Sequence, residues 1–230
     1  MPTLSIVIPC YNEERTLGTL LELVHSVPLS IDKEIIVVDD ASTDNTPGIL
    51  DAYSSKVDIV IRQVNNQGKG AAIATGLSVA TGNYLIIQDA DLEYDPHEYE
   101  MLIQPLLEKE ADVVYGSRFL NDDLASDRYL LHTFANKFLT SLSNMFTSFS
   151  VTDMETCYKV FTKEVYSKLT VTEKRFGMEP EITAKLSKLG VRLIEKPISY
   201  KARRYNEGKK IGFWDGIRAI VCILKFNLLP

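Results

Sequence analysis

Two aspartates separated by one alanine, Asp89 and Asp91, follow the apolar run Tyr84–Ile87, and Glu93 lies two residues further on. A short apolar run between polar residues predicts a buried strand. Ligands of open α/β sheets collect outside the carboxyl ends of such strands. Carboxylate oxygens at that place suit a hard cation such as Mg²⁺ or Mn²⁺. A cation held there could also bind a diphosphate and neutralise the charge on a departing phosphate.

A solvated acidic turn is the competing interpretation of this acidic stretch. Asp95 is well placed to cap a helix that begins at Pro96. The turn explains Asp95 but not Asp89, because an unpaired charge beside an apolar strand is expensive. Acidic pairs of this kind are common, so the rest of the chain has to decide between the two interpretations.

Other polar turns follow the predicted strands at the same edge of the sheet. The segments Ile8–Glu14 and Val38–Asp44 follow the first two strands, and Gly116–Arg118 follows the fifth. None contains the Gly-X-Gly-X-X-Gly pattern of a dinucleotide site. Their acidic side chains could instead bind the N–H groups of a base or the hydroxyls of a ribose. For Ser42 and Asp44, helix capping is the alternative role.

A glycine-rich loop, Asn65–Ala72, places Lys69 at a predicted helix start, where backbone N–H groups can receive an anion. It is not a P-loop, because Gly70 rather than Ser or Thr follows the lysine. A plain turn with a solvated lysine is the alternative.

Alternating apolar runs and amphipathic stretches in the first half predict an α/β fold with a mostly parallel sheet flanked by helices. The expected strands are Leu4–Ile8, Glu34–Val38, Val57–Ile61, Tyr84–Ile87 and Val113–Tyr115. The expected helices are Glu13–Val27, Asp44–Ser54, Gly70–Ala80 and Pro96–Leu107.

Two later segments carry apolar residues at helical spacing. One stripe is Leu130, Phe134, Phe138, Leu142, Met145 and Phe149; the other is Trp214, Ile217, Val221, Leu224 and Leu228. A helix that faces the core is the more common explanation of such a stripe, and a helix on a membrane surface is the other.

The composition fits a globular chain of 230 residues with 45% hydrophobic residues. The formal net charge of -6 argues against nucleic acid as a partner. Three scattered cysteines fit a reducing cytoplasm better than a disulfide framework. We find no signal-peptide pattern and no apolar run of the ~18 residues that span a bilayer.

The motifs together resemble family 2 glycosyltransferases, most closely the dolichyl-phosphate and polyprenyl-phosphate sugar synthases. The resemblance is collinear over nearly the whole chain and rests on Pro9–Glu13, Val38–Asp44, Gly68–Ala71, Gln88–Asp91, Gly116–Arg118 and Gly208–Ile211. It implies a GT-A fold over residues 1–210. The apolar spacing of the residues that follow predicts an amphipathic tail over 211–230 that could anchor the chain to a membrane surface. The resemblance also implies a metal-dependent hexosyltransferase that transfers the sugar of a UDP- or GDP-linked donor with inversion of its anomeric configuration.

The resemblance implies roles for particular residues. The nucleotide pocket would be formed by Pro9, Tyr11, Glu13, Asp40, Lys69, Asp89 and Ala90. The metal would be held by Asp89, Asp91 and Glu93, and the catalytic residues would be Asp91, Asp153 and Arg118. Acceptor phosphate contacts would come from Arg203, Arg204, Lys209 and Lys210. The segment Phe176–Glu181 resembles a further acidic element of the family.

The basic segment Lys201–Lys210, with five cations and one anion, favours a phosphate-bearing acceptor. A polyprenyl phosphate already carries an ionised oxygen, with a second pKa near ~6, and needs no general base. A solvated basic loop is the alternative for this segment. Basic residues beside Trp214 and the apolar tail indicate peripheral attachment to an anionic membrane at its cytoplasmic face.

Two further functions stay open at this point. A hydroxyl acceptor on a polysaccharide or lipid-linked glycan would require Asp153, Glu179 or Glu181 as a base. A nucleotide-binding scaffold without activity is the third possibility, which the Asp89 and Asp91 pair argues against.

Overall fold

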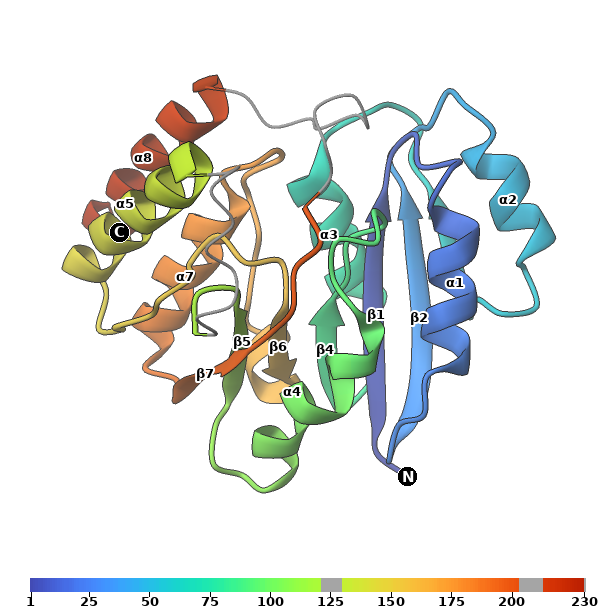
Figure 1. Cartoon of the computed structure of the whole chain (residues 1–230), viewed down its shortest axis with the longest axis horizontal. Coiled ribbons are helices and arrows are strands. Elements are labelled where there is room, and N and C mark those ends of the chain that lie inside the picture. The colour runs from blue at the N-terminus through green and yellow to red at the C-terminus, as the bar shows by residue number, and fades with distance from the viewer. Residues whose placement is uncertain (121–129, 203–212, 230) are drawn as a thin grey trace.

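The computed structural model describes residues 1–120, 130–202 and 213–229, in which helices surround one sheet (Figure 1). The strands are β1 (Thr3–Cys10), β2 (Asp32–Asp39), β3 (Ile59–Arg62), β4 (Tyr84–Ile87), β5 (Val113–Ser117), β6 (Lys159–Thr162) and β7 (Leu193–Pro197). The helices are α1 (Leu17–Ser26), α2 (Thr46–Ala52), α3 (Lys69–Val79), η1 (Pro96–Glu98), α4 (Tyr99–Leu107), α5 (Leu130–Phe146), α6 (Lys163–Tyr166), α7 (Met178–Leu189) and α8 (Phe213–Leu228).

The sheet has the order β3-β2-β1-β4-β6-β5-β7, and β6 runs antiparallel to both of its neighbours. The other pairings are parallel, which confirms the predicted α/β class. In the register, Cys10 pairs with Asp39 and Val7 pairs with Ile87. The carboxyl ends of β1, β2 and β4 therefore meet at one edge of the sheet.

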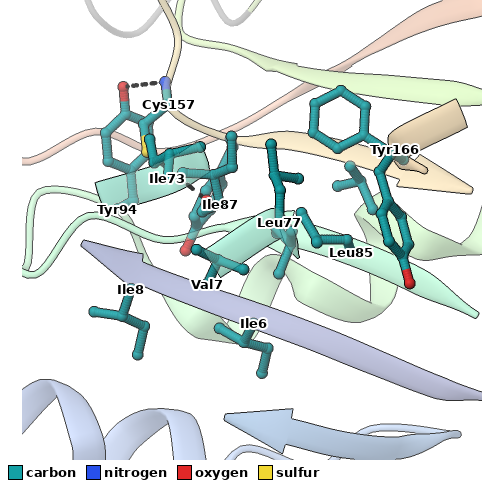
Figure 2. Packing of buried hydrophobic residues seen from close by; sticks show 14 of the residues in the cluster. Ile6, Val7, Ile8, Ile73, Leu77, Leu85, Ile87, Tyr94, Cys157 and Tyr166 are labelled. Atoms are coloured by element: carbon teal, nitrogen blue, oxygen red, sulfur yellow. Dashed lines mark hydrogen bonds between the residues drawn. The ribbon is translucent and has the colours of Figure 1, made fainter. Parts of the chain in front are cut away.

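The centre of the sheet is held by aliphatic side chains of its parallel strands and of α3. Val7 of β1 and Ile87 of β4 lie near Ile73 and Leu77 of α3 (Figure 2). All four side chains are buried. Burying side chains of this size contributes roughly 1.5–3 kcal/mol each, so this layer is a rigid support for the loops at its edge.

The five predicted strands are present, whereas β6 and β7 were not predicted. β6 begins at Lys159, whose buried ammonium donates to the carbonyl oxygens of Met154, at 2.9 Å, and Thr156. β7 is half-buried along its whole length. Neither strand therefore has the continuous apolar run by which a buried strand is recognised in a sequence.

The predicted cap at Asp95 is confirmed. Its Oδ1 accepts a hydrogen bond from the backbone N–H of His97 at 3.0 Å, and Pro96 follows as the first helical residue. The helix opens with the short turn η1 before it continues as α4.

α5 and α8 lie side by side with α7 at the β7 end of the sheet (Figure 1). The whole apolar stripe of α8 is exposed, so the core-facing interpretation is wrong for that helix. The other stripe is divided, because Phe134, Phe138 and Met145 are exposed whereas Leu142 and Phe149 pack against the core. Phe134 is 71% and Met145 77% exposed on α5, and Trp214 is 78% and Leu228 63% exposed on α8.

The opposite faces of these helices make the contacts with the rest of the chain. α8 buries Ala219, Cys222 and Ile223. α5 buries Leu139 together with the polar residues Thr140 and Ser143, while its exposed side carries phenylalanine. The predicted boundary between residues 210 and 211 lies outside the described residues, but α8 itself belongs to the common core.

Candidate functional site

A pocket of about 380 Å³ opens at the carboxyl edge of the sheet. It is formed by the turns after β1, β2 and β4, by the start of α3, and by two later segments. Its lining residues are Pro9, Cys10, Tyr11, Glu13, Asp40, Asn66, Gly68, Lys69, Ala72, Asp89, Ala90, Asp91, Glu93, Arg175, Phe176 and Tyr200. All seven residues predicted for the nucleotide and all three predicted for the metal are therefore brought together around one cavity.

Asp40 lines this pocket and also shapes it. Its two carboxylate oxygens accept the backbone N–H groups of Gln67, at 2.8 Å, and Gly68, at 2.6 Å. A buried carboxylate thus holds the glycine-rich loop in place across 28 residues of sequence. The turn after β2 is tied to the turn after β1 as well, since Ser42 Oγ accepts the N–H of Asn12. Asp44 lies one residue before Asn45, the N-cap of α2, and accepts the N–H groups of Thr46 at 2.9 Å and Glu14 at 3.1 Å.

Lys69 is the cation at the centre of the site. Its Nζ lies 2.8 Å from Oδ1 and 3.0 Å from Oδ2 of Asp89, and 3.5 Å from Oε1 of Glu179. Burial acts to lower the pKa of Lys69, but the charges of its acidic neighbours, chiefly Asp89, raise that pKa well above its usual value. The ion pairs with Asp89 and Glu179 therefore favour the charged form of Lys69 beside the aspartate pair.

Asp91 and Glu93 make contacts of their own. Asp91 Oδ1 accepts the backbone N–H of Glu93 at 3.2 Å, and Glu93 Oε2 accepts the hydroxyl of Tyr200 at 2.6 Å. Within residues 1–120, 130–202 and 213–229, no three side chains of metal-binding type form a ready-made cluster. The predicted trio thus lines one pocket without converging on a single point.

The side-chain oxygens of these residues are nevertheless suitable ligands for a divalent cation. Asp89 and Asp91 offer hard oxygen ligands, and the remaining ligands of Mg²⁺ are commonly substrate phosphates and water. The ammonium of Lys69 lies 2.8 Å from Asp89, so positive charge is favourable beside this carboxylate.

Arg118 and Asp153 form a buried ion pair outside the set of residues that line the pocket. Arg118 Nε and Nη2 each lie 2.7 Å from an oxygen of Asp153, which also accepts the N–H of Arg118 at 3.0 Å. Arg118 stacks over the ring of Tyr200, 5.0 Å from its centroid, and so reaches the pocket through that residue. Because Asp153 is fully buried and its oxygens face Arg118, it is poorly placed to take a proton from a substrate.

Glu181 and Glu179 of α7 differ sharply in their contacts. Glu181 accepts hydrogen bonds from the N–H groups of Thr172 and Glu173 and from Lys185. Glu179 has one oxygen, Oε2, that is buried without a hydrogen-bond partner. Of the three carboxylates considered as a base, only Glu179 thus has an oxygen that is uncommitted.

A second carboxylate with an uncommitted oxygen, Glu155, lies close to Glu179. Its Oε1 is buried without a hydrogen-bond partner. Burial raises the pKa of Glu155 to about 8, with a further increase from the negative charge of Glu179. Lys159 and Arg118 oppose this shift, and Asp153 adds to it.

Arg175 and Tyr200 line the pocket but belong to no predicted motif, whereas Asn66 and Phe176 lie in the segments Asn65–Ala72 and Phe176–Glu181 without a predicted role of their own. Tyr200 follows a half-buried strand and precedes the basic segment, and no spacing rule marks it. Arg203, Arg204, Lys209 and Lys210, which we predicted for the acceptor phosphate, lie outside the described residues. None of the helices in the described ranges combines the length and apolar character needed to cross a bilayer.

A mostly parallel sheet with an acidic pair and a polar pocket at its carboxyl edge is the architecture of the GT-A fold. Residues 5–170 match the sequence model of glycosyl transferase family 2, and the chain belongs to that family.

Named relatives fall in the same class. The chain is 28% identical over 222 residues to the low-salt glycan biosynthesis hexosyltransferase Agl6 of Haloferax volcanii, covering 95% of this chain and 52% of Agl6. It is 33% identical over 117 residues to a dolichol-phosphate mannosyltransferase of Pyrococcus furiosus, covering 50% of this chain and 33% of that protein. The chain thus spans about half the length of Agl6 and a third of the mannosyltransferase.

Solved structures agree on the fold. Glucosyl-3-phosphoglycerate synthase from Mycobacterium tuberculosis, in complex with Mg²⁺ and uridine diphosphate, superimposes with a TM-score of 0.75 at 19% identity. The match covers 100% of this chain and 80% of that one. A complex of the same enzyme with Mn²⁺, uridine diphosphate and glucosyl-3-phosphoglycerate gives a TM-score of 0.71.

Proposed function

We propose that this chain transfers a sugar, with inversion, from a nucleoside diphosphate sugar to a polyprenyl phosphate. The observation that carries this proposal is the pocket in which every residue expected for the nucleotide lies beside Asp89 and Asp91. Family membership supports the class of reaction.

In this proposal Pro9, Tyr11, Glu13 and Asp40 contact the nucleoside, and Asp89 and Asp91 hold Mg²⁺ or Mn²⁺ with Glu93 nearby. A bound divalent cation would neutralise charge on the departing nucleoside diphosphate. Lys69 adds a second positive charge on the same side of the pocket, 2.8 Å from Asp89. The complexes of the M. tuberculosis synthase with Mg²⁺ or Mn²⁺ support a metal requirement.

A phosphate acceptor needs no general base, which is consistent with Asp153 being poorly placed to act as one. An ionised phosphate oxygen needs orientation and charge compensation rather than proton removal. Arg118 is held rigidly by Asp153 beside Tyr200 and could supply part of that compensation. The dolichol-phosphate mannosyltransferase among the relatives supports a lipid phosphate acceptor.

The exposed faces of α5 and α8 support attachment to a membrane surface, where a polyprenyl phosphate resides. Together they present Phe134, Phe138, Met145, Trp214, Ile217, Val221 and Leu228, which we name the α5–α8 apolar surface. Exposed apolar side chains gathered on neighbouring helices favour an interfacial role over a freely solvated one.

Thermal unfolding with UDP, GDP or dTDP, each with and without Mn²⁺, tests the donor site. One nucleotide at about 100 times its Kd should stabilise the chain by about 2.7 kcal/mol, but only with the metal. Asp89→Asn and Asp91→Ala should abolish this effect, whereas Asp95→Asn, outside the pocket, should preserve it. Equal stabilisation after thorough chelation contradicts the metal site.

Transfer of labelled sugar to a short polyprenyl phosphate then tests the acceptor. Glu179 leaves a hydroxyl acceptor as the second candidate, because its Oε2 has no hydrogen-bond partner. If sugar passes to a glycan hydroxyl and Glu179→Gln abolishes that transfer, the hydroxyl acceptor is correct. If transfer to the lipid phosphate survives Glu179→Gln, the polyprenyl phosphate is correct.

A further inference from the structure

One wall of the pocket comes from a segment between α6 and α7. Arg175 and Phe176 of this segment line the cavity, although neither belongs to the motifs that mark the donor site. We name residues 173–176 the wall segment.

The wall segment packs directly on the start of α3. The carbonyl oxygen of Lys174 accepts the N–H of Ala71 at 3.2 Å, and Lys174 Nζ donates to Gln67 Oε1 at 3.3 Å. A Cβ at Gly68, where φ is +102°, would collide with the Lys174 carbonyl, and one at Gly70 would collide with the Glu173 carbonyl. These two glycines therefore allow the wall segment to approach Lys69 and the donor pocket.

The start of the wall segment is fixed from α7. Glu181 accepts the N–H of Thr172 at 2.8 Å and that of Glu173 at 2.7 Å. Its Oε1 also accepts the Thr172 hydroxyl at 2.6 Å. This carboxylate is fully buried, so the backbone at residues 172 and 173 has little freedom to move along α7.

The side chain of Glu173 links the same segment to α8. Its Oε2 lies 2.6 Å from Arg218 Nη2 and 3.1 Å from Arg218 Nε, and its Oε1 lies 3.4 Å from Lys225 Nζ. Burial acts to raise the pKa of Glu173, but its bonds to Arg218 and Lys225 outweigh burial and lower that pKa. Glu173 is thus an anion whose carboxylate binds α8 while its backbone touches α3.

We infer that Glu173 is a positioning residue that couples α8 to the donor pocket. The ion pairs with Arg218 and Lys225 hold the wall segment against Gly68–Gly70, and this contact keeps Arg175 and Phe176 at the cavity. Any displacement of α8 should therefore shift Arg175 and Phe176 in the pocket where the donor binds. The inference rests on the proposed function in one respect, because it takes the pocket to be the site where the nucleotide binds.

The test removes the link from either side. Glu173→Gln removes the anion, and the double variant Arg218→Met with Lys225→Met removes both cations from α8, outside the pocket. Arg192→Met breaks an Arg–Asp112 ion pair that is remote from the wall segment and is the matched control. Arg218→Lys keeps the charge and serves as the conservative variant.

Two readouts separate this inference from the proposed function. The first is the Kd for UDP or GDP with Mn²⁺, expected to rise about fivefold to tenfold in Glu173→Gln and in the double variant. Turnover at saturating donor should stay close to wild type. Combining all three substitutions should add nothing further, because they break one link. Arg192→Met and Arg218→Lys should remain within about twofold of wild type.

The second readout is amide hydrogen exchange of peptides spanning residues 66–76, which needs no nucleotide. Exchange there should accelerate about tenfold in both link variants and not in Arg192→Met. Unchanged exchange, or faster exchange with an unchanged Kd, overturns the inference. If the wild-type chain binds no nucleotide, the proposed function fails, and the exchange rates alone decide whether Glu173 holds the wall segment.

Discussion

Asp153 and Asp112 each accept three hydrogen bonds from one arginine, two from its guanidinium and one from its backbone N–H, but in different surroundings. The Asp153–Arg118 pair is buried, whereas Arg192 and Asp112 remain substantially exposed. Asp153→Asn leaves the Arg118 charge buried without its counter-ion and should cost about 3 kcal/mol of unfolding free energy. Asp112→Asn should cost less than about 1 kcal/mol. Urea unfolding measures both, and equal losses would mean that burial of the first pair is irrelevant to stability.

Glu155 should make the stability of the chain depend on pH. Its pKa rises from an ordinary 4.5 to about 8 in the folded chain because of burial and the charge of Glu179. Between these values the folded chain binds more protons than the unfolded chain, so stability falls as pH rises from 5 to 8.

Glu155→Gln should remove that part of the pH dependence. Between pH 5 and pH 8, the melting temperature of wild type should fall by at least about 2–4 °C more than that of Glu155→Gln. Lys159, whose pKa burial lowers to about 8, contributes in the opposite direction only above this range. Parallel melting curves for the two proteins across these pH values would contradict the assignment.

The exposed faces of α5 and α8 form the surface that we propose to contact a membrane. The α5–α8 apolar surface places the only tryptophan of the chain, Trp214, on its exposed side. If this surface enters a bilayer interface, Trp214 emission should shift to shorter wavelength on addition of phosphatidylcholine vesicles containing phosphatidylglycerol.

Substitutions on either helix should weaken vesicle binding. Phe138→Ser on α5 and Val221→Ser on α8 should each reduce affinity by roughly fivefold, because each removes apolar area from the interface. Val64→Ser is the control, since Val64 is also exposed but lies after β3, at the other end of the sheet. Loss of binding in Val64→Ser to the same extent would mean that attachment is not localised to the two helices.

At the scale of the whole molecule, α8 is part of the folded core rather than an appended tail. Removing residues 213–230 uncovers the surface that Ala219, Cys222 and Ile223 occupy and breaks both ion pairs of Glu173. We expect this truncation to lower the unfolding free energy by about 3 kcal/mol or more, measured by urea unfolding. A truncated chain as stable as wild type would contradict this packing.

Much of this molecule could be predicted from local patterns in the sequence. The strands β1 to β5 and the cap at Asp95 depend on neighbouring residues, and continuous apolar runs or turn chemistry mark them. The pocket residues at strand ends were also predictable, because parallel strands deliver their carboxyl ends to one edge. The collinear motifs then identified the family.

Only the tertiary structure decided which partners these residues meet and which helix faces reach solvent. Asp153 and Arg118 are 35 residues apart in sequence, and no local pattern pairs them. The apolar stripes of α5 and α8 look alike whether they face a core or the outside, because periodicity reports a face and not its direction. The neighbours of each helix settle that direction, and so it is decided only when the chain is folded.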